Sequence, residues 1–288
     1  MVTSFHQRLH AIRACAFAAM WLATGSHAAP TKLSGPLVPG GNVTSATISA
    51  PAVVANTRVV FAADKDVNGT VELYSVPING GVPTKLTVLQ SLVGSPPFRV
   101  SPDGATVVFR ATGSTPTLTG VFSVPTAGGA TTPLSGALVS GGSVSNYAIS
   151  PDSTRVLFTA DKDTLGKTEV YSVPIGGGAV TKLSGTTVTN GNTLLATFTA
   201  DSARVLMLAD KDVDGVFELF SAPSSGGATI KLSGSLVTGG RVNSIGGSAG
   251  GRVHFVAEKD TVGMDELYSV STTGGAVVKL SGTLIAGT

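Results

Sequence analysis

Residues 144–183 read VSNYAISPDSTRVLFTADKDTLGKTEVYSVPIGGGAVTKL, and this stretch decides the fold. Four segments in it are rich in residues that favour strands: 144–149, 155–159, 169–173 and 180–183. The first reversal contains Pro151 and Asp152, which favour a tight turn. The last reversal contains three consecutive glycines, which take positive φ at little steric cost. The stretch therefore predicts a meander of four short antiparallel strands.

The same unit recurs along the chain. Its closing motif, Thr181-Lys182-Leu183-Ser184-Gly185, has counterparts centred on Leu33, Leu86, Leu134, Leu232 and Leu280. The six copies follow one another at steps of 53, 48, 49, 49 and 48 residues. Similarity at a fixed period marks a repeat architecture, in which stacked units share a core that one unit could not bury alone. The period predicts five repeats, over about residues 36–87, 88–136, 137–185, 186–234 and 235–282.

The second strand of each repeat indicates how the repeats pack. Its centre holds consecutive apolar residues, with one polar exception: Val59-Val60-Phe61, Val107-Val108-Phe109, Val156-Leu157-Phe158, Val205-Leu206-Met207 and Val253-His254-Phe255. A strand that is wet on one face would alternate, so both faces of these sheets are expected to be covered. Blades of a propeller meet this condition. We therefore predict an all-β chain whose residues 29–288 form a β-propeller of about five four-stranded blades, either closed or open.

The repeat resembles the TolB-type, WD-repeat-like propeller unit. The matching elements are the turn Ser101-Pro102-Asp103-Gly104 and four copies of a Glu-x-aromatic strand: Glu72-Leu73-Tyr74, Glu169-Val170-Tyr171, Glu218-Leu219-Phe220 and Glu266-Leu267-Tyr268. The resemblance implies a propeller but no particular activity, because propellers serve as binding platforms and as enzymes. The family commonly has six blades, against the five counted here. The segment Thr31–Ser34 is then a surplus N-terminal strand, since the last repeat has its own copy at Val278–Ser281.

Residues 1–28 have the layout of a cleaved signal peptide. Arg8 and Arg13 precede an apolar run from Ala14 to Ala23, and small residues follow at Ser26-His27-Ala28. The run is about half of the roughly 20 residues needed to cross a bilayer, so we expect no permanent membrane span. The protein is therefore predicted to be exported, either to the periplasm or to the extracellular medium.

Removal of residues 1–28 would leave a chain with no cysteine and with one histidine, His254. Disulfide and thiol chemistry are thereby excluded. The remaining seventeen basic residues would balance seventeen acidic ones, which removes the electrostatic basis for non-specific nucleic-acid binding. We expect a protein or glycan partner instead, bound through loops at one end of the propeller.

The loop after the second strand of the fourth repeat is the best candidate metal site. Asp210, Asp212 and Asp214 alternate before Gly215, and Glu218 follows. Calcium collects several carboxylate oxygens at one turn, so these four acids predict a Ca²⁺ site. The alternative is a solvated hairpin loop in which Asp and Lys pair at the surface, because the second repeat has no acid in its loop at all. No other cofactor is expected.

Three further features are weaker candidates for functional sites. Gly246-Gly247-Ser248-Ala249-Gly250 matches the Gly-x-Ser-x-Gly elbow of serine hydrolases, but it aligns with a turn between two strands, whereas the elbow needs a following helix. His254 interrupts an apolar register and is read either as a general base or as a tolerated strand residue. The closing motif carries a lysine in five of its copies: Lys32, Lys85, Lys182, Lys231 and Lys279. These closing-strand lysines would either bind an acidic partner or prevent exposed sheet edges from pairing with other strands.

These features favour a non-catalytic binding or scaffolding propeller, and no catalytic residue is predicted. One alternative is a hydrolase or lyase working in the tunnel of the propeller with carboxylates, which requires acids from several repeats to converge. Another is a structural surface repeat without a discrete ligand, which fits the low charge and the similarity of the repeats.

Overall fold

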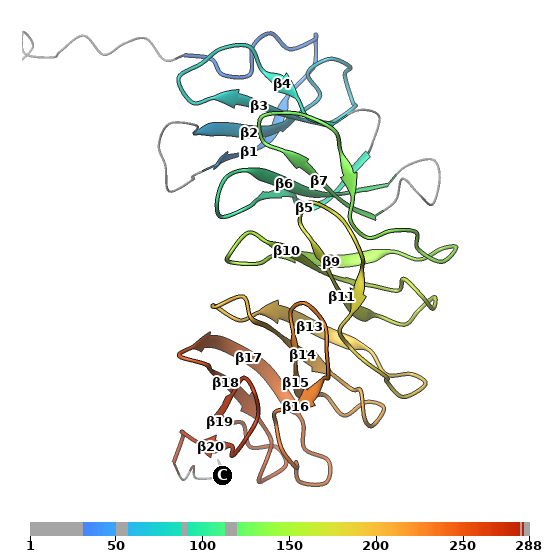
Figure 1. Ribbon diagram of the computed structural model, residues 1–288, viewed down its shortest axis with the longest axis vertical. Coiled ribbons are helices and arrows are strands. Elements are labelled where there is room, and N and C mark those ends of the chain that lie inside the picture. Colours follow the sequence, from blue (N-terminus) through green and yellow to red (C-terminus); the bar gives the residue numbers. More distant parts are fainter. Residues whose placement is uncertain (1–30, 50–56, 88–90, 113–119, 283, 285–288) are drawn as a thin grey trace, which may run out of the picture. The chain divides into compact units, whose positions relative to one another are not determined.

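The computed structural model describes residues 31–49, 57–87, 91–112, 120–282 and 284. These residues form twenty strands and no helix, and the strands make five four-stranded antiparallel sheets (Figure 1). Each predicted repeat range contains one sheet, and all five lie in the compact unit Leu33–Thr288. The all-β propeller class is therefore confirmed. The predicted signal peptide lies outside the described residues.

Every sheet is a meander with its strands in chain order. The first contains β1 (Val43–Ser49), β2 (Arg58–Ala63), β3 (Glu72–Pro77) and β4 (Thr84–Lys85). The second contains β5 (Ser91–Val100), β6 (Thr106–Thr112), β7 (Gly120–Pro125) and β8 (Thr132–Pro133). The third contains β9 (Val144–Ile149), β10 (Arg155–Ala160), β11 (Glu169–Pro174) and β12 (Thr181–Lys182). The fourth contains β13 (Thr193–Phe198), β14 (Arg204–Ala209), β15 (Glu218–Pro223) and β16 (Ile230–Lys231). The fifth contains β17 (Val242–Ala249), β18 (Arg252–Ala257), β19 (Glu266–Ser271) and β20 (Val278–Lys279).

The third sheet shows why the repeat sequence folds this way. Ser150 donates its hydroxyl to the Asp152 carboxylate at 2.6 Å, and that carboxylate accepts the Thr154 amide at 3.0 Å, which closes the first turn. At the last turn Gly177 has a φ of 92°, and a Cβ there would lie 2.6 Å from the Thr132 methyl of the second sheet. This glycine is therefore needed both for its conformation and for the close approach of two sheets.

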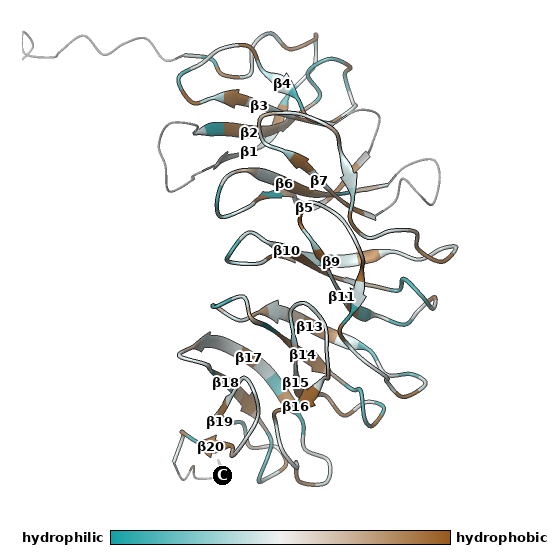
Figure 2. Cartoon of the chain, viewed as in Figure 1, coloured by the Kyte–Doolittle hydropathy of each residue, from teal (hydrophilic) through white to brown (hydrophobic). Residues whose placement is uncertain are grey.

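The core lies between consecutive sheets and uses both faces of each second strand. On β10, Phe158 packs with Val108 and Leu134 of the second sheet, whereas Leu157 packs with Phe198 of the fourth. Both side chains are at most 2% exposed. Burying a side chain of this size contributes about 2 kcal/mol, so each junction stabilises the two sheets that it joins. Figure 2 shows the apolar residues concentrated on the strands.

Strand contacts join sheets that follow one another in sequence: β1 with β5, β7 with β9, β10 with β13, and β14 with β17. Within four of the sheets, two aromatic rings stack on neighbouring strands at 5.3–5.7 Å: Phe61 with Tyr74, Phe109 with Phe122, Phe158 with Tyr171, and Phe255 with Tyr268. The fourth sheet has Met207 opposite Phe220 at these positions.

The surplus N-terminal copy of the closing motif has a place in the structure. Leu33 packs against Phe61 and Tyr74 of the first sheet, on the face that in later sheets receives a closing leucine from the preceding repeat. The linker after it repeats a bond found in later repeats: the Val38 amide donates to the Lys65 carbonyl at 3.0 Å, as Val139 does to Lys162 at 2.9 Å. The N-terminal segment therefore replaces part of a preceding blade for the first sheet.

No helix among the described residues is long and apolar enough to cross a membrane.

Candidate functional site

The predicted metal loop is organised by backbone contacts. Asp210 is 4% exposed, and its carboxylate accepts the amides of Asn192 and Gly215, the latter at 3.0 Å. Asp64 does the same in the first repeat with the amides of Asn42 and Gly69, and the hydrogen bond from Asn42 lowers the pKa of that carboxyl. The first acid of the loop thus fastens the hairpin to the linker before the sheet.

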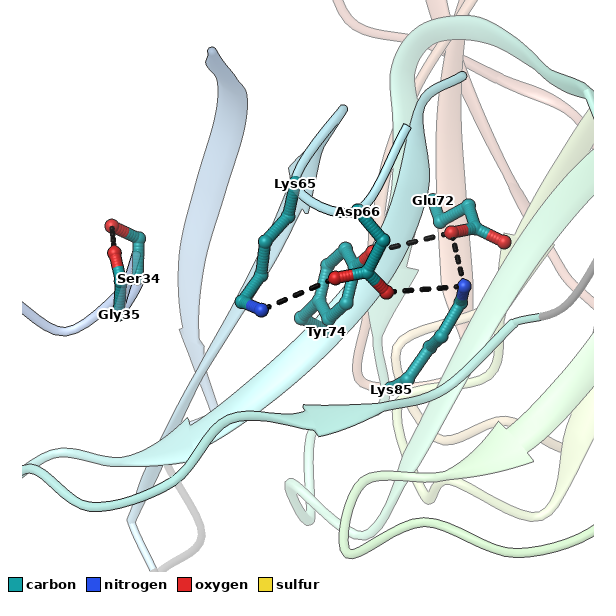
Figure 3. A network of polar contacts seen from close by, with 7 residues as sticks. All are labelled: Ser34, Gly35, Lys65, Asp66, Glu72, Tyr74 and Lys85. Atoms are coloured by element: carbon teal, nitrogen blue, oxygen red, sulfur yellow. Dashed lines mark hydrogen bonds and ion pairs between the residues drawn. The ribbon is translucent and has the colours of Figure 1, made fainter. Parts of the chain in front are cut away.

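The third strand carries a second buried acid, which is held by a lysine of the fourth strand. In the first sheet Lys85 pairs with Glu72 at 2.5 Å and with Asp66 at 3.2 Å, and the Tyr74 hydroxyl donates to Glu72 at 3.2 Å (Figure 3). Hydrogen bonding to Glu72 raises the pKa of Lys85. Burial, followed by the hydrogen bond with Asp66, raises the pKa of Tyr74. Lysine, tyrosine and both acids therefore form one closed network.

The network recurs in the third and fifth sheets. Lys182 pairs with Glu169, and Tyr171 donates to Glu169 at 3.1 Å and to Asp163 at 3.0 Å. The fifth sheet repeats this with Lys279, Glu266, Tyr268 and Asp260. The closing-strand lysines of the first, third, fourth and fifth sheets are thus engaged by acids of their own sheet.

The fourth sheet departs from this pattern because Phe220 stands where the other networks have tyrosine. Lys231 pairs with Glu218 and lies 3.8 Å from Asp212. The second carboxylate oxygen of Glu218, Oε2, has no hydrogen-bond partner among the described residues, although this side chain is 4% exposed. A buried acceptor without a partner costs about 1–3 kcal/mol.

Each of the four predicted calcium ligands is therefore already engaged by another group. Asp210 accepts hydrogen bonds from backbone amides, and Asp212 lies near Lys211 and Lys231. Asp214 accepts a hydrogen bond from the side-chain amide of Asn190 at 3.0 Å, and Glu218 pairs with Lys231. Within the described ranges, no group of three or more His, Cys, Asp or Glu side chains is placed to hold a metal ion. The calcium site stays a prediction, and ligation by Glu218 would require Lys231 to move away from it.

Ser248 has a structural contact that its motif did not reveal. Its hydroxyl accepts the Ala200 amide of the fourth sheet at 2.9 Å. Ser153 and Ser202 accept the amides of Asp103 and Asp152 at 3.0 Å in the same way. The Gly-x-Ser-x-Gly segment lies at the end of β17, and the next element is β18, so the strand-to-helix context of a hydrolase elbow is missing here.

His254 lies opposite an irregularity in the same hairpin. The register of β17 and β18 shifts between Ile245 and Ser248, which leaves Gly246 and Gly247 across from His254. A Cβ on Gly246 would lie 1.9 Å from His254 Nε2, so the imidazole needs a glycine at that point. This contact explains why the glycine-rich stretch and the polar strand residue occur together in the fifth repeat.

The turns of the fourth and fifth sheets enclose a hollow of about 370 Å³, which is the candidate binding site. Its lining comes from three turns: Thr199, Ala200 and Asp201, then Ser248 to Gly251, then Thr272. A neighbouring hollow of about 300 Å³ shares Ser248 and Ala249 and adds Arg252, His254 and Ser269. Sequence reasoning missed the larger hollow because its small residues come from two repeats, and only their placement side by side makes a site.

The hollow contains a carboxylate that is held by its own turn. The Thr199 hydroxyl donates to Asp201 at 2.6 Å, and this bond lowers the pKa of the Asp201 carboxyl. Asp201 is therefore an ionised acceptor at neutral pH, not a proton donor. In the neighbouring hollow Arg252 donates from Nε and Nη2 to the Ser269 hydroxyl at 3.0 and 2.7 Å. The polar groups that the lining of the larger hollow exposes include the Asp201 carboxylate, the half-buried Ser248 hydroxyl and the backbone of Gly250 and Gly251.

Comparison with known proteins supports the fold alone. No protein-family model and no curated protein matches the sequence. Among solved structures, one of a eukaryotic initiation factor is similar at 9% identity and a TM-score of 0.53, covering 83% of this chain and 55% of that one. A prolyl endopeptidase structure is similar at 13% identity and a TM-score of 0.51, covering 82% of this chain and 36% of that one. A structure assigned as TolB from Agrobacterium tumefaciens has 17% identity and a TM-score of 0.43, with 76% of each chain covered.

Proposed function

We propose that this protein is an exported, non-catalytic binding propeller that captures a protein or glycan through the turns of its fourth and fifth sheets. The observation that supports this function most is the hollow of about 370 Å³, because three turns from two repeats converge on it. Binding sites are concave and carry a few polar groups that orient the ligand. Asp201, which is exposed, and Ser248, which is half-buried, supply such groups.

Two competing functions fit the described residues less well. A carboxylate hydrolase or lyase needs an acid that is free to move a proton, whereas Glu72, Glu169, Glu218 and Glu266 pair with lysines. A structural repeat without a ligand would need no hollow. Capture without turnover separates the three functions, because an enzyme would consume the ligand and a structural repeat would not retain it.

The test is binding of the labelled full-length chain to an array of oligosaccharides and extracellular-domain proteins. Ala200→Trp should abolish capture, because Ala200 is exposed in the hollow and the indole would fill it while the backbone bond to Ser248 remains. Pro151→Trp is the matched control, since Pro151 holds the same turn position in the third repeat. Equal capture by both variants, or release of a cleaved product, would overturn the proposal.

Export and calcium binding belong to the same proposal. Residues 1–28 support export by their signal-peptide layout. The mass of the protein recovered outside the cytoplasm should correspond to a chain that begins at Ala29, and an uncleaved mass would contradict it.

The calcium site rests on the spacing of Asp210, Asp212, Asp214 and Glu218.

A further inference from the structure

The turns between the first and second strands join consecutive repeats by the same contact at two junctions. The Asp103 amide donates to the Ser153 hydroxyl at 3.0 Å, and the Asp152 amide donates to the Ser202 hydroxyl at the same distance. Ser153 and Ser202 have φ values of 63° and 62°, and each stands two residues before the arginine that begins the second strand. At both junctions an aspartate of one turn therefore binds a serine hydroxyl of the next turn.

The serine hydroxyl contacts both polar groups of the aspartate. It accepts the Asp152 amide, and it also hydrogen-bonds the Asp152 carboxylate. Burial alone would raise the pKa of this carboxyl, but hydrogen bonds from Ser150, Thr154 and Ser202 lower it. A hydroxyl suits this place because one oxygen both accepts and donates. The aspartate of the turn is thus a hydroxyl-binding group.

The junction between the fourth and fifth repeats lacks the serine. Gly250 occupies the position of Ser153 and Ser202, since it stands two residues before Arg252, the first residue of β18. Its φ of 56° is close to theirs. A Cβ on Gly250 would meet nothing within 4 Å. The place that a serine side chain takes at the two earlier junctions is therefore open here.

The turn of the fifth repeat is also shorter than that of the fourth. Four residues separate the paired Ser248 and Val253, against six between the paired Phe198 and Val205. The Ser248 hydroxyl accepts the Ala200 amide at 2.9 Å, one residue before the aspartate of the fourth turn. The short turn leaves room beside that aspartate, where the hollow of about 370 Å³ lies.

Asp201 keeps the groups that bind a hydroxyl at the other junctions. Its Oδ1 accepts the Thr199 hydroxyl and the Ala203 amide at 2.6 and 3.1 Å. No other residue in the described ranges hydrogen-bonds its Oδ2 or its amide. Ser248 adds a donor, because its oxygen accepts a bond while its O–H stays available. One acceptor and two donors therefore surround the place of the missing hydroxyl.

We propose that the hollow binds a neutral sugar, one hydroxyl of which takes the place of the missing serine hydroxyl. The inference rests on the proposed function and narrows its ligand to a glycan. The sugar hydroxyl accepts the Asp201 amide and donates to the Asp201 carboxylate, and the next hydroxyl on the ring accepts from Ser248.

Other ligands fit this set of groups less well. A peptide backbone cannot replace the hydroxyl, because its N–H only donates and its C=O only accepts. The ionised Asp201 repels acidic sugars. Ligand pockets span about 300–1,000 Å³, so a hollow of about 370 Å³ suits a small ligand of about one or two sugar rings.

The test is a titration of the ¹⁵N-labelled full-length chain with cellobiose, maltose, lactose and chitobiose, each up to about 50 mM. At least one disaccharide should shift the amide signals of Asp201 and Gly251 until they saturate. Gly250→Ser should weaken this binding by about tenfold or more, because its hydroxyl takes the place of the sugar hydroxyl. Gly166→Ser is the matched control and should bind as the wild type does. Gly166 has a φ of 77° in a loop of the third repeat, and a Cβ there would also meet nothing within 4 Å.

Asp201→Asn tests the carboxylate and decides the matter if Gly250→Ser does not fold. It keeps an oxygen for the turn but loses the charged acceptor, so binding should again weaken about tenfold. Asp152→Asn, the same change in the third repeat, should leave binding unchanged. Three results would overturn the proposal: no shift with any disaccharide, equal binding by the wild type and Asp201→Asn, or binding of glucuronic acid or a serine tripeptide in their place.

The sugar site and the proposed function fail separately. A protein captured by the wild type and lost in Ala200→Trp, with no sugar bound, would support the proposed function and overturn the sugar site. Cleavage of a disaccharide that binds through Asp201 would do the reverse, because the sugar site would hold and the non-catalytic function would not.

Discussion

The third and fourth sheets have the same strand order and similar repeat sequences. The buried glutamate at the start of the third strand, however, has different partners in the two sheets. Glu169 is held by Lys182 and by the hydroxyl of Tyr171. Within the described part of the chain, Glu218 is held by Lys231 alone, because Phe220 has no hydroxyl, and its Oε2 has no partner there. The comparison shows that the lysine is common to both networks and that the tyrosine is a second contact which is absent from the fourth sheet.

The largest expected effect comes from removing the lysine in each sheet. Lys231→Met should destabilise the protein by about 3 kcal/mol, because it leaves a buried carboxylate with neither partner. Lys182→Met should cost about 2 kcal/mol, because Tyr171 still donates to Glu169. Urea unfolding measures both. Equal losses would show that the tyrosine contributes nothing to holding the acid.

A double variant checks that the loss in the fourth sheet comes from the unpaired charge. Lys231→Met combined with Glu218→Leu should recover most of the lost free energy of unfolding, since replacing a buried ion pair by apolar residues is often neutral. If the double variant is as unstable as Lys231→Met, the lysine acts through packing of its aliphatic stem instead.

The second-largest expected effect is a gain of stability when Phe220 is replaced by tyrosine. Phe220→Tyr should stabilise the protein by about 1.5 kcal/mol, because its hydroxyl can donate to Glu218 Oε2, and hydrogen bonds to charged groups contribute about this much. The thermal midpoint should rise by a few degrees. Phe122→Tyr is the control: Phe122 is 3% exposed and the second sheet has Gly120 in place of the acid, so the added hydroxyl should destabilise.

The third-largest expected effect is a fall in the unfolding free energy at low pH. The hydrogen bond from Lys279, followed by the one from Tyr268, lowers the pKa of Glu266. The folded carboxyl therefore binds its proton at lower pH than the unfolded one, so its stabilisation is present above the unfolded pKa of about 4.3 and is lost as the pH falls through the folded value. Glu266→Gln should flatten the fall in unfolding free energy between about pH 5 and pH 3.

Lys279→Met should flatten the same part of the profile, because it removes the main cause of the lowered pKa. Lys259→Met should leave it unchanged, since the Lys259 ammonium donates to the Ser235 carbonyl and has no ion pair with an acid in the described ranges. An unchanged slope in Lys279→Met would mean that other carboxyls, such as Asp64, dominate acid unfolding.

Much of this architecture could be predicted from the sequence, because the repeat reports it several times. The first strand of the third repeat was predicted at 144–149 and is observed as β9, Val144–Ile149. The fourth strand was predicted at 180–183 but is two residues long, β12. The Leu183 amide still bonds the Val170 carbonyl at 2.7 Å, but its side chain turns into the core. Strand ends depend on such packing, which a local pattern does not contain.

The contacts of the candidate residues were harder to predict, because they join neighbouring strands or neighbouring repeats. The alternating acids at 210–218 are visible in the sequence, but the pairing of Glu218 with Lys231 is a contact between neighbouring strands. Ser248 was recognised through a hydrolase motif, whereas its partner is the backbone of Ala200 in the preceding repeat. Motifs report residues that are near in sequence, and this hollow is formed by residues about fifty positions apart.

The smallest expected effect is that of calcium on the fourth-repeat loop. Ca²⁺ sites of extracellular modules bind in the millimolar range, so about 5 mM CaCl₂ should add roughly 1 kcal/mol and raise the thermal midpoint by about 2 °C. A chelator should reverse the shift and Asp214→Asn should abolish it, because Asp214 is the acid of this loop that makes neither a lysine pair nor a backbone bond among the described contacts. If the midpoint does not move, the acids of this loop are neutralised by Lys211 and Lys231 without a metal ion, and the departure of the fourth sheet from the third reduces to one missing hydroxyl.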